Sequence, residues 1–135
     1  MPDSSLFQEL RAPIAISLGA IGGALCRYYL TRWSLTQWGN GFPYGTLLIN
    51  LSGCAIMGLV NGLGPKPSPL QLLATTGFLG AYTTFSTYGL ETVQLFQRGA
   101  IGLAGSYWLG SAGLGLLFVV LGQGLGAAIR QGLGR

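Results

Sequence analysis

Charged residues are scarce in this 135-residue chain and make up only 7% of it. Ordinary soluble domains carry about 25% charged residues, so a soluble domain this small would have too little charge to cover its surface. The chain has no histidine and only 2 cysteines, which excludes the usual donor sets of zinc and haem sites. Half of the residues are hydrophobic and 24 are glycine. This composition predicts a protein of the lipid bilayer.

The basic residues are scattered, so the net charge of +4 predicts no nucleic-acid partner. They lie near the ends of the apolar segments, as is usual in membrane proteins: Arg11, Arg27, Arg32, Lys66, Arg98, Arg130 and Arg135. Cys26 and Cys54 both lie inside apolar segments. We expect them to be small buried hydrophobic residues rather than the halves of a disulfide.

Four apolar segments predict an all-α membrane protein, with one four-helix transmembrane domain over residues 1–135. The segments cover about 13–33, 43–63, 70–97 and 100–129, each near the ~20 residues that cross a bilayer core. Pro13 suits the opening turn of the first helix. Thr36 to Asn40 form a polar link, and the proline-rich stretch 64–69 predicts a non-helical turn.

The third segment carries the strongest functional signal, in residues 77–88. Glycines, hydroxyl residues and aromatic rings are mixed there in the sequence GFLGAYTTFSTY, a composition that disfavours an unbroken helix. A break at membrane depth survives only where protein, an ion or a water-filled path satisfies the freed backbone groups. Transporters place ion sites at such broken helices, so this segment predicts a protein that handles an ion.

Pairs of small residues at helical spacing predict close helix packing. The pairs are Gly19 with Gly23, Ser106 with Gly110, Ser111 with Gly115, and Gly122 with Gly126. Either all of them pack the helices of one subunit together, or some face a second subunit. Because four short helices enclose little space for an ion path, we expect self-association.

The distribution of positive charge gives little preference for one orientation in the membrane. Four helices place both termini and the link between segments two and three on one side. That side holds four basic residues (Arg11, Lys66, Arg130, Arg135) and the other holds three (Arg27, Arg32, Arg98). Orientation follows the excess of Lys and Arg on the cytoplasmic side. This small bias is compatible with insertion in both directions and an antiparallel dimer, or with one orientation fixed by one or two dominant charges.

Several motifs together resemble the Fluc (CrcB) fluoride channel family. They are Gly22-Gly23-Ala24 with Arg27-Tyr28, Pro43-Tyr44-Gly45-Thr46-Leu47 with Asn50 and Gly53, and Gly77-Phe78-Leu79-Gly80 with Thr83-Thr84-Phe85-Ser86-Thr87. The resemblance covers nearly the whole chain. It implies an antiparallel, dual-topology homodimer in the bacterial inner membrane, with two fluoride pores and a central structural sodium ion. Its activity would be passive export of cytoplasmic fluoride, which reduces fluoride toxicity.

The resemblance also implies which residues form the sites. The fluoride pore residues would be Asn50, Phe85, Ser86, Thr87, Tyr88, Glu91, Tyr107 and Ser111. The backbone carbonyls of Gly80 and Thr83 would hold the sodium ion at the dimer interface, and Arg27 would be a structural or interface residue. Tyr88 departs from the family pattern, which has phenylalanine there, and its hydroxyl can either donate to fluoride or block its neighbour.

Elementary chemistry agrees with a fluoride path. Fluoride is small and strongly hydrated, so a pore must replace its water with hydrogen-bond donors. Asn50 and the hydroxyls of Ser86, Thr87 and Ser111 are donors without a fixed positive charge, and aromatic rings offer a positive edge to an anion. The simpler interpretation is that the hydroxyls bond to their own helix, and that Phe85 and Tyr88 only pack.

Other functions compete with this interpretation. A proton-coupled antiporter of the four-helix dual-topology type needs a membrane-embedded carboxylate in its first helix, but no Asp or Glu lies between Pro13 and Thr31; the only candidate is Glu91. An accessory subunit without transport of its own would leave the Thr-Thr-Phe-Ser-Thr cluster unexplained. An enzyme is least expected, because the sequence holds no nucleophile–base pair, metal cluster or phosphate loop.

Overall fold

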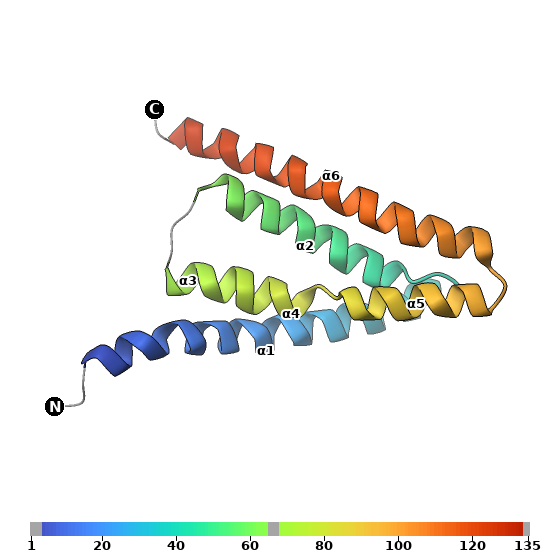
Figure 1. Cartoon of the computed structure of the whole chain (residues 1–135), viewed down its shortest axis with the longest axis horizontal. Helices are drawn as coiled ribbons and strands as arrows, with labels where there is room; N and C mark the ends of the chain where they lie inside the picture. The colour runs from blue at the N-terminus through green and yellow to red at the C-terminus, as the bar shows by residue number, and fades with distance from the viewer. Residues whose placement is uncertain (1–3, 65–67, 134–135) are drawn as a thin grey trace.

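Each predicted apolar segment is helical in the computed structural model, which describes residues 4–64 and 68–133 (Figure 1). Three segments form continuous helices: α1 (Ser4–Trp38), α2 (Tyr44–Gly62) and α6 (Ile101–Leu133). The third segment is divided into α3 (Pro69–Leu72), the π-helix η1 (Leu73–Leu79), α4 (Gly80–Tyr82) and α5 (Phe85–Gln97). The described part of the chain contains no strand.

The first helix is longer than the predicted segment at both ends. It begins at Ser4, so the prediction that Pro13 lies in the opening turn is wrong: Pro13 lies inside α1. Membrane helices tolerate such a proline where other groups satisfy the freed carbonyl. The helix also continues through most of the predicted polar link and ends at Trp38. At the other link, Pro69 is the first residue of α3, where a missing N–H is harmless, while residues 65–67 lie outside the described residues.

Within the described residues, three helices are long and apolar enough to cross a membrane, namely the spans Glu9–Trp38, Tyr44–Gly62 and Ile101–Leu133. The third segment runs beside them but is interrupted, and its longest regular piece, α5, has 13 residues. The start of α1, the end of α2, the start of α3 and the end of α6 lie at one end of the bundle, here called the terminal end (Figure 1). The turns at 39–43 and 98–100 lie at the other end, here called the turn end (Figure 1).

This topology places the charges as the sequence predicts. Arg11 lies in the first part of α1 and Arg130 in the last turns of α6, both toward the terminal end. Arg27 and Arg32 lie in the last third of α1, and Arg98 caps α5 at the turn end. Lys66 and Arg135 lie outside the described residues.

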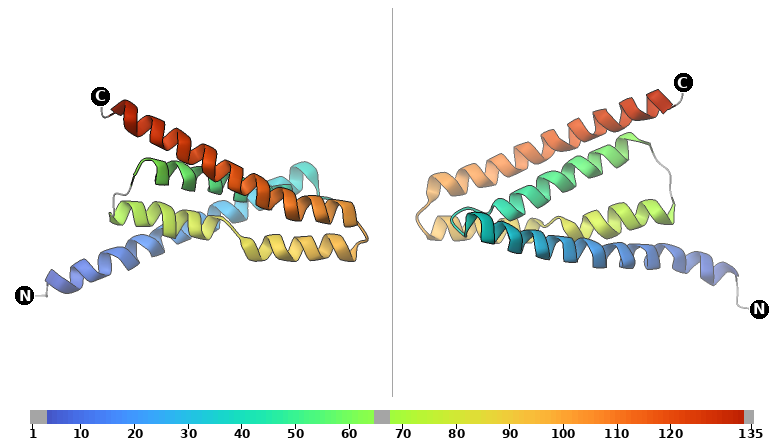
Figure 2. Two further views of the ribbon diagram at one scale, coloured as in Figure 1. Left: turned by 45° about the horizontal axis from the view of Figure 1, so that its top comes forward. Right: turned by 180° about the vertical axis from the view of Figure 1, so that it is seen from behind.

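Glycine brings two pairs of parallel helices into backbone contact. Helices α2 and α6 lie side by side, and so do α1 and the first half of the third segment (Figure 2). A Cβ atom at Gly122 would lie 2.1 Å from the Ala55 carbonyl oxygen, and one at Gly23 would lie 2.1 Å from the Phe78 carbonyl oxygen. The pairs Gly19–Gly23 and Gly122–Gly126 therefore pack helices within one chain. In contrast, nothing lies within 4 Å of a Cβ built at Gly110.

The buried apolar side chains form two clusters on either side of the break in the third segment. One contains Ile49, Leu79 and Tyr82, and the other contains Tyr88, Leu95, Ala104 and Tyr107. Both cysteines are free, as expected. Cys54 is half-buried, but Cys26 is exposed on α1, so the prediction that both are buried is wrong for Cys26.

Candidate functional site

The helix break predicted between residues 77 and 88 is confirmed and falls at Thr83 and Thr84. Their backbones are extended, with φ −78° and ψ 157° at Thr83 and φ −149° and ψ 115° at Thr84. The seven π-helical residues of η1 come shortly before it, and π-helical turns are frequent at functional sites. The departure from α-helix therefore begins before the break, at Leu73, and a short α-helical piece, α4 (Gly80–Tyr82), separates the π-helix from the extended residues.

Asn50 of α2 hydrogen-bonds to the backbone at the break. Its Oδ1 accepts a hydrogen bond of 2.8 Å from the Thr84 N–H, and its Nδ2 donates one of 3.0 Å to the Thr84 carbonyl. One amide side chain thus satisfies both backbone groups of an extended residue, which lipid cannot do. Asn50 is one of the predicted pore donors. The structure uses one of its two N–H groups for the backbone, which leaves the other N–H.

Thr84 begins the helix that follows the break. Its Oγ1 accepts a hydrogen bond of 3.2 Å from the Thr87 N–H, a typical helix N-cap. The same oxygen donates to the Thr87 Oγ1 at 2.9 Å and lies 3.4 Å from the Ser86 Oγ. The predicted pore residues Ser86 and Thr87 are therefore brought together around Thr84. The Thr87 hydroxyl accepts in this network and keeps its own proton for another acceptor.

The break removes the helical donors of the backbone carbonyls just before it, among them those of Gly80 and Thr83. In a continuous helix, the Gly80 carbonyl would accept from the Thr84 N–H and the Thr83 carbonyl from the Thr87 N–H. Here the first of these N–H groups donates to Asn50 and the second to the Thr84 hydroxyl. The carbonyls of Gly80 and Thr83 are the predicted sodium ligands. Gly80 itself is exposed and Thr83 is half-buried.

Glu91 accepts hydrogen bonds from two other helices. Its Oε1 accepts from the Thr46 hydroxyl of α2 and its Oε2 from the Tyr107 hydroxyl of α6, both at 2.8 Å. Thr46 and Tyr107 are almost completely buried, at 2% and 1% exposure. A carboxylate inside a membrane bundle is expensive unless it is hydrogen-bonded. These two donors fix the Glu91 side chain and tie α5 to both of its neighbours.

The aromatic residues after the break differ sharply in exposure. The Phe85 ring is 84% exposed in the single chain, whereas Tyr88 is 7% exposed. Their ring centroids lie 5.7 Å apart, and the Tyr88 ring lies 5.3 Å from that of Tyr107. The Tyr88 hydroxyl donates to the Trp108 carbonyl of α6. The hydroxyl that departs from the family pattern is thus engaged by the protein backbone.

Ser111 and Arg27 stand apart from these networks. The Ser111 Oγ is buried and has no hydrogen-bond partner among the described residues. Most serines inside membrane helices bond to their own backbone, so a buried hydroxyl without a partner is a free donor. Arg27 is half-buried on α1, and within the described ranges no hydrogen bond or ion pair joins it to another side chain.

Sequence reasoning quoted Thr46 as part of a motif but did not predict it as a site residue, although a signal for that role exists. Thr46 precedes Asn50 by four residues, so both lie on one face of α2. Gly53 continues that face, and a Cβ atom there would lie 2.3 Å from the Thr83 Cγ2. The face of α2 that contacts the break is thus made of Thr46, Asn50 and Gly53.

The chemistry that this site supports is ion handling. It offers neutral hydroxyl and amide donors, ring edges and free carbonyls. Among the described residues, no group of three or more His, Cys, Asp or Glu side chains is placed to hold a metal ion.

Comparison with known proteins identifies the family. Residues 14–123 match the model of the family described as CrcB-like protein, Camphor Resistance (CrcB). A protein of Trichormus variabilis, named fluoride-specific ion channel FluC, is 49% identical over 93% of this chain and 95% of its own length. Proteins of the same name from two other bacteria, a Synechococcus and a Synechocystis, are 51% and 54% identical, over 84% and 85% of this chain and 91% and 92% of their own lengths. The chain is therefore a multi-pass bacterial membrane protein that belongs to the CrcB-like family.

Proposed function

We propose that this chain is a fluoride-selective channel of the bacterial inner membrane, through which cytoplasmic fluoride leaves the cell passively. One observation carries the proposal: relatives named fluoride-specific ion channel match 84–93% of the chain at 49–54% identity. An ion channel is not an enzyme, and the site holds donors for an anion rather than groups for covalent chemistry. Passive export would keep fluoride below toxic levels in the cell.

The donors of the site suit a dehydrated fluoride ion. The Ser111 hydroxyl is buried without a partner, and the Thr87 hydroxyl keeps its proton. The Asn50 amide keeps one N–H. Ser86 is exposed, and its hydroxyl lies 3.4 Å from that of Thr84. Such donors replace hydration water without a fixed positive charge that would hold the anion tightly. Ring edges of Phe85, Tyr88 and Tyr107 add a weaker attraction.

Glu91 positions a ring of the path and does not donate to the ion. Both of its oxygens accept hydrogen bonds from protein, so it fixes the Tyr107 ring beside the path. Arg27 is proposed as an interface residue, because a half-buried arginine inside an apolar span requires protein or water around its charge.

The functional unit is proposed to be an antiparallel dimer of this chain. The ring of Phe85 and residues Gly80 and Ser86 are exposed in the single chain, next to a break whose backbone cannot face lipid. A second copy is the simplest cover for that surface. The small difference in Lys and Arg between the two ends allows copies to insert in opposite directions.

Charge-biased variants test the antiparallel arrangement. Two lysines added near Lys66 should fix one orientation, and two added near Arg98 should fix the other. Each variant alone should reach the membrane but lose fluoride export, and co-expression of the two should restore it. Full export by one variant whose labelling shows a single orientation would contradict the antiparallel dimer.

A structural sodium ion at the dimer interface is the remaining part of the proposal. The carbonyls of Gly80 and Thr83 have lost their helical donors, and hard cations prefer oxygen ligands. Two copies related by a two-fold axis would offer two such pairs, and the bound cation would join the two breaks. We expect the purified dimer to melt at a higher temperature in sodium than in potassium or N-methylglucamine salts of equal ionic strength. Equal melting in all three would contradict a sodium site.

Reconstitution into liposomes tests the function itself. With valinomycin carrying the compensating potassium current, the protein should release fluoride and retain chloride, without a pH gradient. Phe85→Ala should reduce fluoride release strongly, whereas the matched variant Phe96→Ala, an exposed ring near the turn end of the same helix, should not. Release that requires a pH gradient would favour the antiporter, and equal chloride release would indicate an unselective pore. Absence of any flux would favour an accessory subunit.

A further inference from the structure

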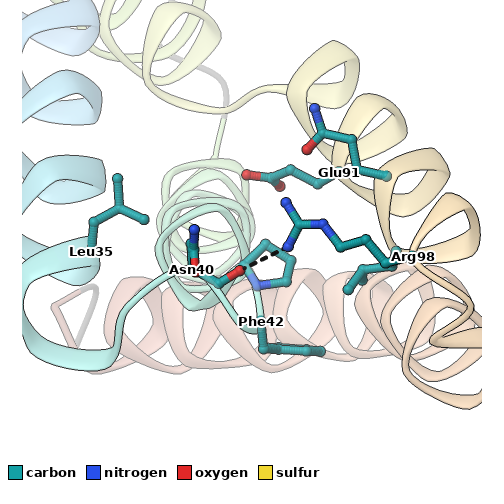
Figure 3. Close-up of a pocket in the computed structure, with 8 residues that line it drawn as sticks. Leu35, Asn40, Phe42, Glu91 and Arg98 are labelled. Atoms are coloured by element: carbon teal, nitrogen blue, oxygen red, sulfur yellow. Dashed lines mark hydrogen bonds between the residues drawn. The ribbon is translucent and has the colours of Figure 1, made fainter.

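A pocket of about 160 Å³ opens at the turn end, between the 39–43 turn and the last turns of α5. Its polar lining comes from Asn40, Glu91, Gln94 and Arg98, and its apolar lining includes Phe42 (Figure 3). Among the proposed pore residues, only Glu91 contributes to this pocket. The pocket therefore raises the question of what its other polar residues do.

The inner wall of the pocket is shared with the candidate pore. Glu91 lines the pocket and also accepts the Tyr107 hydroxyl. Phe42 lines it too, and its ring meets that of Tyr107 edge to face, with centroids 5.4 Å apart. Two residues of the pocket wall, Phe42 and Glu91, thus contact Tyr107 of the aromatic group formed by Phe85, Tyr88 and Tyr107.

Arg98 spans the opposite side of the pocket. It caps α5, and its Nη1 donates a hydrogen bond of 3.2 Å to the Asn40 carbonyl of the 39–43 turn. Figure 3 shows the Arg98 side chain extending across the pocket toward Asn40. Within the described ranges, no carboxylate forms an ion pair with Arg98, although Glu91 lines the same pocket. Arg98 therefore has no direct ion-pair partner among the described residues, and among them only one of its five N–H donors is engaged, in the bond to the Asn40 carbonyl.

We propose that this pocket is the aqueous mouth of the fluoride path and that Arg98 recruits the anion there. The inference rests on the proposed function. A fixed cation at the mouth raises the local concentration of anions, while the neutral donors further in release the ion again. Asn40 and Gln94 line the same pocket, and their side-chain amides add donors for an anion that is still partly hydrated. Arg98 would thus set how readily fluoride enters, not how fast a loaded pore conducts.

The experiment compares Arg98→Gln and Arg98→Lys with a matched control, Arg32→Gln. Arg32 lies in the last third of α1, is exposed, and bonds the Tyr28 hydroxyl instead of lining the pocket. Fluoride flux from liposomes is measured at low and at saturating fluoride. Each measurement is made at ~0.01 M and at ~1 M of an impermeant salt, where the Debye length is ~30 Å and ~3 Å.

Recruitment by charge predicts a specific pattern. Arg98→Gln should lower flux at low fluoride about three- to fourfold in low salt, as expected for one charge about 5–6 Å from the ion in water. The loss should vanish at saturating fluoride and in high salt. Arg98→Lys should restore the flux, and Arg32→Gln should leave it unchanged.

Other outcomes overturn the inference in different ways. If Arg98→Gln and Arg98→Lys lose flux equally at all fluoride and salt concentrations, Arg98 only fastens the 39–43 turn. If Arg32→Gln has the same salt-dependent loss, the effect belongs to the general charge of the turn end. If Arg98→Gln has wild-type flux at low fluoride in low salt, Arg98 does not recruit the anion. If the wild-type protein itself passes no fluoride, the proposed function fails and this inference fails with it.

Discussion

Helices α2 and α6 are held together by backbone contact, whereas the third segment is held to α2 by side-chain hydrogen bonds. At the α2–α6 seam, a Cβ atom built on Gly122 would lie 2.1 Å from the Ala55 carbonyl oxygen, and one built on Gly58 would lie 2.2 Å from the Val119 carbonyl oxygen. At the break, Asn50 pairs with the backbone of Thr84, and Thr46 donates to Glu91. One helix, α2, thus meets α6 through glycines and meets the third segment mainly through polar side chains.

This difference follows from the state of the backbone. A continuous helix satisfies its own N–H and C=O groups, so its stability in lipid depends on close packing. A broken helix has free polar groups, and protein must satisfy them. The seam therefore needs residues without side chains, and the break needs residues whose side chains replace backbone partners. Substitutions on the two faces of α2 should fail for different reasons.

The largest expected effect comes from filling the seam. In Gly122→Ala with Gly126→Ala, the new Cβ atoms would lie 2.1 Å from the Ala55 oxygen and 2.3 Å from the Leu59 oxygen. The helices must separate, at about 1–3 kcal/mol for each site. We expect aggregation or a much lower melting temperature in detergent, measured by circular dichroism. Gly124→Ala is the matched control on the same turns, because nothing lies within 4 Å of its Cβ, and it should be neutral or slightly stabilising.

Removing the Asn50 side chain should have an effect of about the same size on stability. Asn50→Ala leaves the Thr84 N–H and carbonyl without partners, at about 1–3 kcal/mol for each buried group. We expect both lower thermal stability and a strong loss of fluoride flux, because the same residue closes the break and lines the proposed path. Asn50→Asp keeps the acceptor for the Thr84 N–H but loses the donor to the Thr84 carbonyl and adds a negative charge to the path, so its fluoride flux should be at least as low as that of Asn50→Ala. An unchanged melting temperature in Asn50→Ala would show that the Asn50 side chain contributes nothing to stability.

The existence and place of the break could be predicted from sequence, because glycine and hydroxyl residues in an apolar segment disfavour an unbroken helix. The side chain that hydrogen-bonds to the backbone at the break could not be predicted. Asn50 was predicted as a pore donor, but its bonds to Thr84 depend on how α2 lies against the third segment, which local sequence does not specify. The start of α1 was also missed. Pro13 looks like an opening residue by propensity, yet the chain before it is helical from Ser4.

Close packing can also be tested on the face of α2 that contacts the break, because Gly53 lies on that face. A Cβ atom at Gly53 would lie 2.3 Å from the Thr83 Cγ2, so Gly53→Ala should destabilise the protein by about 1–3 kcal/mol. Thr83→Ser removes that methyl group and keeps the hydroxyl, which donates to the Leu79 carbonyl. The double variant should therefore recover most of the lost stability, as measured by thermal unfolding. No recovery would mean that the space at Gly53 is needed by something other than Thr83.

The smallest expected effect is at Tyr88 of α5, whose side chain both donates a hydrogen bond to α6 and packs against it. Its hydroxyl donates to the Trp108 carbonyl, while its ring packs against Tyr107. Tyr88→Phe removes the donor and keeps the ring, and it restores the residue that the family pattern has at this position. Because a single neutral hydrogen bond contributes about 0.5–1.5 kcal/mol, the melting temperature should fall slightly and fluoride flux should stay near that of the wild type. Tyr88→Ala, which also removes the ring, should reduce both strongly. If Tyr88→Phe instead abolishes flux at unchanged stability, the hydroxyl acts on the ion and not on the helix.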